Sequence, residues 1–172
     1  ETHGGGAAVS ARLRRRRSVC RKEADMGKSV LTGRSILGLE NFTAEDISRV
    51  LEMADQMKRI VLSENKKKDY LKGKSVVTVF SEASTRTRSS FELAGKYLGA
   101  DVVNITKSGS SMTKGESMRD TLLTVSAMGV DAVIIRDSSE GAAVFASRAW
   151  SPMVKTPIIF NAGDGAHEHP SQ

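Results

Sequence analysis

The chain of 172 residues is long enough for one domain with a sizeable core, and its 39% hydrophobic and 27% charged residues are typical of a soluble globular protein. A single cysteine, Cys20, excludes an internal disulfide and a cysteine-based zinc cluster, and no apolar run approaches the roughly 20 residues of a membrane-spanning helix. The net charge of +6 arises mainly from residues 1–28, which hold eight basic and three acidic residues, so the nearly neutral remainder, with 18 and 17, argues against a nucleic-acid-binding body.

Residues 1–28 are rich in Gly and Arg and show no apolar periodicity, which predicts a disordered basic tail. Their run RLRRRRS could contact RNA, act as an address or resemble part of an organelle transit peptide. The alternative is a solvated tail, or sequence upstream of a start at Met26. No apolar core follows the arginines, so no secretory signal is predicted, and a cytoplasmic protein is expected.

Helical and strand patterns alternate after the tail. The segment 42–64 predicts a helix that begins with Thr43 as N-cap and Asp46 at N3, a variant of the capping box. Strands are then predicted at 75–80, 101–106, 131–136 and 156–163, and helices at 88–100, 117–129 and 139–150. This alternation is typical of βαβ units, so we expect a domain over 29–172 with a parallel sheet of about four strands and helices on both faces.

Polar segments follow all four predicted strands. They read SEASTRTR, TKSGSSMTKGE, RDSSEG and NAGDGAHEHPSQ, and they are rich in hydroxyl groups, basic groups, Gly or His. Ligands of parallel α/β sheets bind beyond the carboxyl ends of the strands. The sequence therefore predicts that its chemistry is collected along one edge of the sheet.

The first of these segments has the character of a phosphate site. Ser84, Thr85, Arg86 and Thr87 follow a strand and open a helix. Backbone N–H groups at a helix N-terminus attract an anion, hydroxyl groups add neutral donors, and a guanidinium can clamp phosphate oxygens. The alternative is an ordinary N-cap, at Ser84 or Thr85, with the arginines in solvent.

The other segments contribute single candidates. Lys114 could supply a positive charge for an anionic substrate or be solvated. Arg136 ends a buried strand, where it either points to the ligand edge or pairs with Asp137. His169 could polarise a carbonyl group, move a proton or be structural. A zinc site is not expected, because His167 and His169 lack a third ligand.

The motifs FSEASTRTRSSFE, KGES, DAVIIR, EGAA, NAGDG and HPSQ, in this order, resemble the N-terminal half of the transcarbamoylase family over roughly residues 30–172. The ornithine branch usually has a cysteine in its last motif, whereas NAGDG followed by HPSQ is similar to the aspartate branch. The resemblance implies a carbamoyl phosphate domain and transfer of the carbamoyl group to L-aspartate in pyrimidine synthesis. It implies no metal or redox cofactor.

The resemblance also implies roles for individual residues. The phosphate group would be held by Ser84, Thr85, Arg86 and Thr87. Arg136 would reach the phosphate and the carbonyl oxygen, His169 would bond the carbonyl oxygen, and Gln172 would bond the carbamoyl NH2 group. Ser110 and Lys114 match residues that reach into the active site of the adjacent subunit of a catalytic trimer. Thr87, Arg136 and His169 would stabilise the oxyanion, and Arg86 and Lys114 the leaving phosphate.

The family continues into a second domain that binds the amino acid and returns a C-terminal helix to the first domain. These 172 residues contain no counterpart of it, so we expect a fragment with little turnover on its own. A homotrimer of the complete protein is expected, and a regulatory subunit is a possible partner. Two alternatives stay open: ornithine or another amine as the acceptor, and a non-catalytic anion-binding module. Binding of nucleic acid is not favoured, because aromatic residues for base stacking are sparse.

Overall fold

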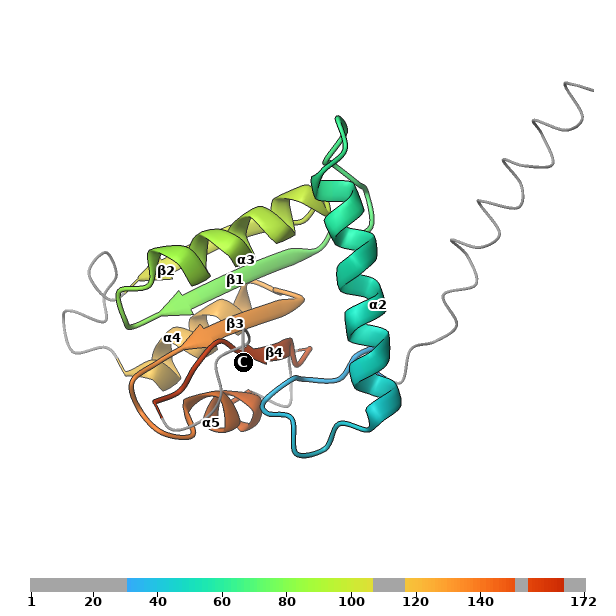
Figure 1. Ribbon diagram of the computed structural model, residues 1–172. Helices are drawn as coiled ribbons and strands as arrows, with labels where there is room; N and C mark the ends of the chain where they lie inside the picture. Colours follow the sequence, from blue (N-terminus) through green and yellow to red (C-terminus); the bar gives the residue numbers. More distant parts are fainter. Residues whose placement is uncertain (1–30, 107–116, 151–154, 166–172) are drawn as a thin grey trace, which may run out of the picture. The chain divides into compact units, whose positions relative to one another are not determined.

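The computed structural model describes residues 31–106, 117–150 and 155–165, and every structural statement below concerns these residues. From Gly33 onward they belong to one compact unit. Figure 1 shows its helices and strands, which are α2 (Ala44–Val61), β1 (Ser75–Phe80), α3 (Thr85–Tyr97), β2 (Asp101–Thr106), α4 (Met118–Ala127), β3 (Ala132–Arg136), α5 (Ala142–Arg148) and β4 (Ile158–Asn161). In the described ranges, no helix combines the length and hydropathy required to cross a membrane.

The sheet has four parallel strands in the order β2-β1-β3-β4. The prediction of a parallel sheet of about four strands is confirmed. Phe80 at the end of β1 lies opposite Thr106 of β2 and Arg136 of β3. The carboxyl ends of these strands therefore meet at one edge, as the alternating pattern predicted.

The strands alternate between the two faces of the sheet. On one face Val77, Val79, Val133 and Ile135 pack with α4 and α5 in a buried cluster. On the other face Val76, Phe80 and Ile134 form a second cluster, against which Phe91 of α3 packs. Helices thus cover both faces, and β1 and β3 read as nearly continuous apolar runs because both of their faces are buried.

A polar network fixes α3 on its face of the sheet. Thr78 Oγ1 donates to Asn104 Oδ1 at 2.6 Å, and Asn104 Nδ2 donates to Glu92 Oε2 at 2.7 Å. Lys96 Nζ donates to Glu92 Oε1, and this hydrogen bond, followed by that from Asn104, lowers the pKa of the Glu92 carboxyl group. The network joins β1, β2 and α3, so the helix start has a defined position relative to the strand ends.

Several element boundaries differ from the prediction. The helix expected at 88–100 already begins at Thr85, directly after Ser84. The helix expected at 139–150 begins only at Ala142, because Gly141 takes a left-handed conformation with φ 74°. The strand expected at 156–163 is shortened to β4, since Pro157 has no N–H to donate and the ladder ends at Asn161.

Candidate functional site

The N-terminus of α3 is unlike those of α2 and α4. Thr43 with Asp46, and Ser117 with Asp120, form capping boxes that place a carboxylate in the first turn of α2 and α4. Ser84 precedes α3 but makes no side-chain capping hydrogen bond, and the first turn of α3 holds no acidic residue. The ordinary cap at Ser84 is therefore not formed. With no carboxylate to offset it, the positive end of the α3 dipole can attract an anion.

The four predicted phosphate ligands come together at this helix start. Thr85 and Arg86 are exposed, and Ser84 and Thr87 are half-buried. They follow the end of β1 through the short loop 81–84, so they lie at the carboxyl edge of the sheet. The position combines backbone donors, hydroxyl groups and a solvent-accessible guanidinium, as phosphate binding requires.

Arg136 ends β3 at the same edge and is held on two sides. Its Nε donates to Glu82 Oε2 at 3.1 Å, and one of its Nη atoms donates to the carbonyl oxygen of Ala162 at 3.1 Å. The first contact is an ion pair in which the Arg136 side chain is 23% exposed. Arg136 thus lies at the carboxyl end of β3, and its ion pair is with Glu82 instead of Asp137. Its contact with a ligand stays a prediction.

Glu82 was not singled out from the sequence. It lies in the loop 81–84, between β1 and the helix start that carries Arg86. Its ion pair therefore connects the two predicted parts of the site, the α3 N-terminus and Arg136. The sequence does place this carboxylate between a predicted strand and a run of residues with hydroxyl and guanidinium groups. It does not indicate which residue the carboxylate pairs with.

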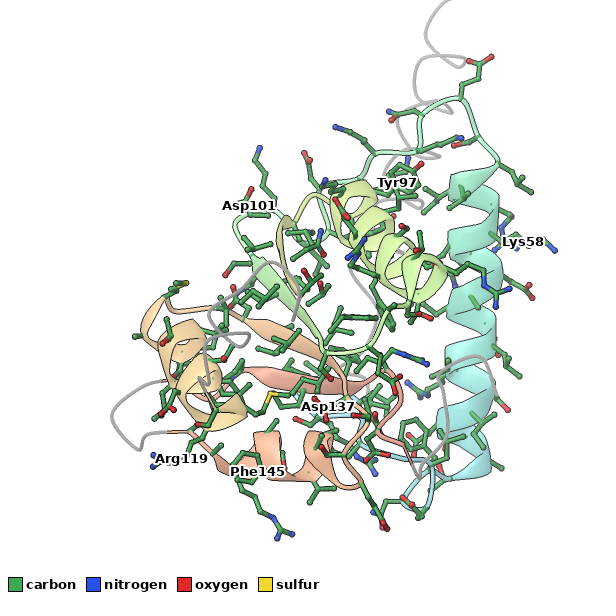
Figure 2. The ribbon with its side chains drawn as sticks, turned by 90° about the vertical axis from the view of Figure 1, so that its left-hand side faces the viewer. Lys58, Tyr97, Asp101, Arg119, Asp137 and Phe145 are labelled. Carbon is green, nitrogen blue, oxygen red and sulfur yellow. The ribbon has the colours of Figure 1, made fainter. Side chains whose placement is uncertain are left out.

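A second side-chain contact joins the loop after β1 to the loop after β3. Ser81 Oγ donates to Asp137 Oδ2 at 2.5 Å, and the backbone N–H of Ser139 donates to Asp137 Oδ1 at 2.8 Å. The backbone N–H of Asp137 donates to the carbonyl oxygen of Gly163 at 3.0 Å, which reaches the segment after β4. Figure 2 shows Asp137 just beyond β3, at the opposite end of the sheet from Asp101, the first residue of β2.

The segment after β4 is fixed by a buried carboxylate. Asp164 is 1% exposed and accepts a hydrogen bond from the Gly141 N–H at 3.2 Å. This contact ties the NAGDG motif to the start of α5. The carbonyl oxygen of Ala162, which accepts a hydrogen bond from Arg136, therefore belongs to a segment whose backbone is held in place.

The other predicted site residues lie outside the described ranges. They are Ser110, Lys114, His169 and Gln172. Their roles stay predictions. Among the residues that are described, no group of three or more His, Cys, Asp or Glu side chains could hold a metal ion.

Comparison with known proteins identifies the family to which this domain belongs. Residues 34–172 match the family described as "Aspartate/ornithine carbamoyltransferase, carbamoyl-P binding domain". The aspartate carbamoyltransferase catalytic subunit of Pelotomaculum thermopropionicum is 51% identical over 142 residues, which are 83% of this chain and 44% of that protein. The corresponding subunit of Corynebacterium diphtheriae is 46% identical over 138 residues, 80% of this chain and 44% of that protein.

Solved structures give the same answer. The aspartate transcarbamoylase of Trypanosoma cruzi, in complex with carbamoyl aspartate and phosphate, superposes with a TM-score of 0.73 at 34% identity and covers 83% of this chain and 44% of its own. The catalytic subunit from M. Jannaschii gives a TM-score of 0.68 at 37% identity, with 80% and 43% covered. The chain thus spans less than half the length of these relatives, and it belongs to the aspartate/ornithine carbamoyltransferase family through its carbamoyl phosphate-binding domain.

Proposed function

We propose that this chain binds carbamoyl phosphate and serves the transfer of its carbamoyl group to the amine of L-aspartate, giving N-carbamoyl-L-aspartate and phosphate. The observation that carries the proposal is the α3 N-terminus, which has neither a side-chain cap nor an acidic first turn and is linked through Glu82 to Arg136. The relatives named as aspartate carbamoyltransferases, and the complex with carbamoyl aspartate and phosphate, support the choice of aspartate as acceptor.

The phosphate group would lie at the start of α3. Its oxygens would accept hydrogen bonds from the N–H groups of the first turn, from the hydroxyl groups of Ser84, Thr85 and Thr87, and from the Arg86 guanidinium. Arg86 is exposed, so its side chain can turn toward a ligand without breaking a packed contact. Phosphate is the leaving group, and these donors would stabilise the charge that it carries away.

Arg136 would act on the carbamoyl group as well. The amine attacks the carbamoyl carbon, negative charge builds on the carbonyl oxygen, and the bond from this carbon to the phosphate oxygen then breaks. A half-buried guanidinium stabilises such an oxyanion more than an exposed one does, because fewer water molecules screen it. The predicted contributions of His169 and Gln172, and of Ser110 and Lys114 from an adjacent subunit of a trimer, belong to the same proposal, as does a place in pyrimidine synthesis.

Calorimetric titration of the 172-residue chain with carbamoyl phosphate tests the proposal. Wild-type protein should bind, Arg86→Ala should show no measurable binding, and Arg59→Ala, which removes a cation from the last turn of α2, should bind like wild type. Circular dichroism checks that all three proteins are folded. Equal binding by wild type and Arg86→Ala would overturn the assignment of the α3 N-terminus.

A further inference from the structure

Two side-chain contacts tie the loop after β1 to the end of β3 and to the residue that follows it. One is the ion pair of Glu82 with Arg136, at 3.1 Å, and the other is the hydrogen bond from Ser81 Oγ to Asp137, at 2.5 Å. The loop after β1 leads into the start of α3, and Arg136 ends β3. The distance between the loop after β1 and the end of β3 therefore sets the spacing between the phosphate site and Arg136.

Only one of these contacts uses the guanidinium that the proposed ligand needs. Glu82 accepts the Nε–H of Arg136, so a phosphate or carbonyl oxygen that takes this N–H has to displace the Glu82 carboxylate. The Ser81–Asp137 hydrogen bond involves neither the Arg136 guanidinium nor the helix start, and the second contact of Ser81 Oγ, at 3.3 Å, is with the backbone carbonyl oxygen of Arg136, so this contact can persist when the ligand is bound.

The geometry of the Ser81–Asp137 contact suits a brace, by which we mean a contact that holds two segments of the chain at a fixed spacing. Phe80 and Arg136 are the last paired residues of β1 and β3, and Ser81 and Asp137 directly follow them along the chain. The backbone of Arg136 is already fixed on this side, because its carbonyl oxygen accepts the Ser81 N–H at 3.0 Å. Asp137 is 7% exposed, and a charge-assisted hydrogen bond to a buried carboxylate is among the stronger ones available to a serine.

We propose that Ser81 and Asp137 are positioning residues, which hold Arg136 in place against the α3 N-terminus when its guanidinium leaves Glu82 for the ligand. This inference rests on the proposed function, which names the ligand. It adds to the proposed site a pair of residues, Ser81 and Asp137, that contact neither substrate. They act by holding the chain after β1 and the chain after β3 at a fixed spacing. In the free protein the two contacts support each other, and in the bound protein Ser81–Asp137 is the contact that remains.

A thermal unfolding cycle tests the brace without any ligand. Glu82→Gln removes the ion pair and so mimics the state in which Arg136 has released Glu82. Ser81→Ala, Glu82→Gln and the double variant are compared with wild type. Because either contact alone can hold the loops, each single variant should lower Tm by about 1–2 °C, and the double variant by clearly more than both together. Strictly additive losses would overturn the proposal.

Titration with carbamoyl phosphate gives the second readout. Ser81→Ala should weaken binding by about 10-fold, since small misplacements of a ligand group are costly. Ser81→Thr keeps the hydroxyl group and should bind within about 2-fold of wild type, and so should Ser48→Ala, whose hydroxyl bonds only to the Ala44 carbonyl oxygen. A purely structural Ser81 would lower Tm and leave the affinity unchanged, which would also overturn the proposal.

The two readouts separate this inference from the proposed function. A synergistic loss of Tm in a protein that does not bind carbamoyl phosphate would support the brace and reject the ligand. Binding of carbamoyl phosphate with equal affinity to wild type and Ser81→Ala would keep the ligand and reject the brace.

Discussion

The Arg136 guanidinium donates its Nε–H to Glu82 Oε2 at 3.1 Å, so a residue of the chain itself occupies one donor of the cation that the proposed ligand needs. The Glu82 side chain is 38% exposed, which leaves it free to move into solvent. A carboxylate and a phosphate compete for the same donors of a guanidinium. A ligand that takes the Nε–H therefore has to open this contact.

Removing the Glu82 charge should strengthen anion binding. Glu82→Gln is expected to tighten the binding of carbamoyl phosphate by about 2- to 5-fold, because an ion pair this exposed contributes roughly 0.2–1 kcal/mol. Calorimetric titration measures the change. Glu45→Gln is the control, since Glu45 also pairs with an arginine at 3.1 Å but lies on α2. Weaker binding by Glu82→Gln would mean that Glu82 orients Arg136 for the ligand instead of competing with it.

The guanidinium of Arg136 should not be replaceable by an ammonium group. Arg136 spans two acceptors at once, Glu82 Oε2 and the Ala162 carbonyl oxygen, and a lysine cannot reproduce this planar fork. Arg136→Lys should weaken carbamoyl phosphate binding by about 10-fold or more, the loss of roughly one charge-assisted hydrogen bond. Arg49→Lys, at an exposed i,i+4 pair, is the matched control and should bind normally. Unchanged affinity of Arg136→Lys would remove Arg136 from the site.

Much of the fold could be predicted from the sequence, because the apolar pattern is local. Runs such as SVVTVF mark strands that are buried on both faces, and their alternation with helical segments leaves a parallel sheet as the consistent arrangement. The same reasoning collects Arg86 and Arg136 at one edge, since the carboxyl ends of parallel strands coincide. Nothing in this argument requires knowledge of a side-chain partner.

The contacts within the site could not be predicted in the same way. Arg136 and Glu82 are 54 residues apart, and Ser81 and Asp137 are 56 apart. Their pairing depends on the register of β1 against β3 and on the path of two loops. The sequence offered Asp137, the neighbour of Arg136 along the chain, as one of two alternatives, whereas the sheet brings Glu82 to the guanidinium from the loop of the adjacent strand.

The NAGDG segment should be sensitive to the last of its glycines. Gly165 has φ 80°, and an added Cβ atom would collide with the carbonyl oxygen of Ser138. Gly165→Ala should lower the free energy of unfolding by more than about 1 kcal/mol, and Tm by about 3–5 °C. Gly129→Ala isolates the collision, because Gly129 has φ 73° but open space around it. Equal losses of Tm for the two variants would show that the Ser138 loop gives way.

Asp131 directly precedes β3, at the amino ends of the strands, and it should make the stability of the protein depend on pH. Its carboxylate accepts hydrogen bonds from Lys155 at 2.8 Å, from the Ser75 N–H at 3.0 Å and from Lys74 at 3.2 Å. These contacts, that of Lys155 first, hold the pKa of Asp131 far below its usual range. A lowered pKa in the folded state means that the stabilisation is complete above the unfolded value of about 4 and is lost as the pH falls below it.

The expected result is a difference between wild type and Asp131→Asn that depends on pH. At pH 7 the variant should unfold at a lower temperature, because it lacks the charge that Lys74 and Lys155 share. As the pH falls from about 4 toward 2, Asp131 takes up a proton in the unfolded chain while it stays charged in the folded protein, so the stabilisation is progressively lost and the two melting temperatures should converge. Asp101→Asn, at the start of β2, controls for the general effect of removing a carboxylate near the amino ends of the strands. A constant difference across the whole range would show that the Asp131 contacts stabilise the strand starts through hydrogen-bond geometry and not through charge.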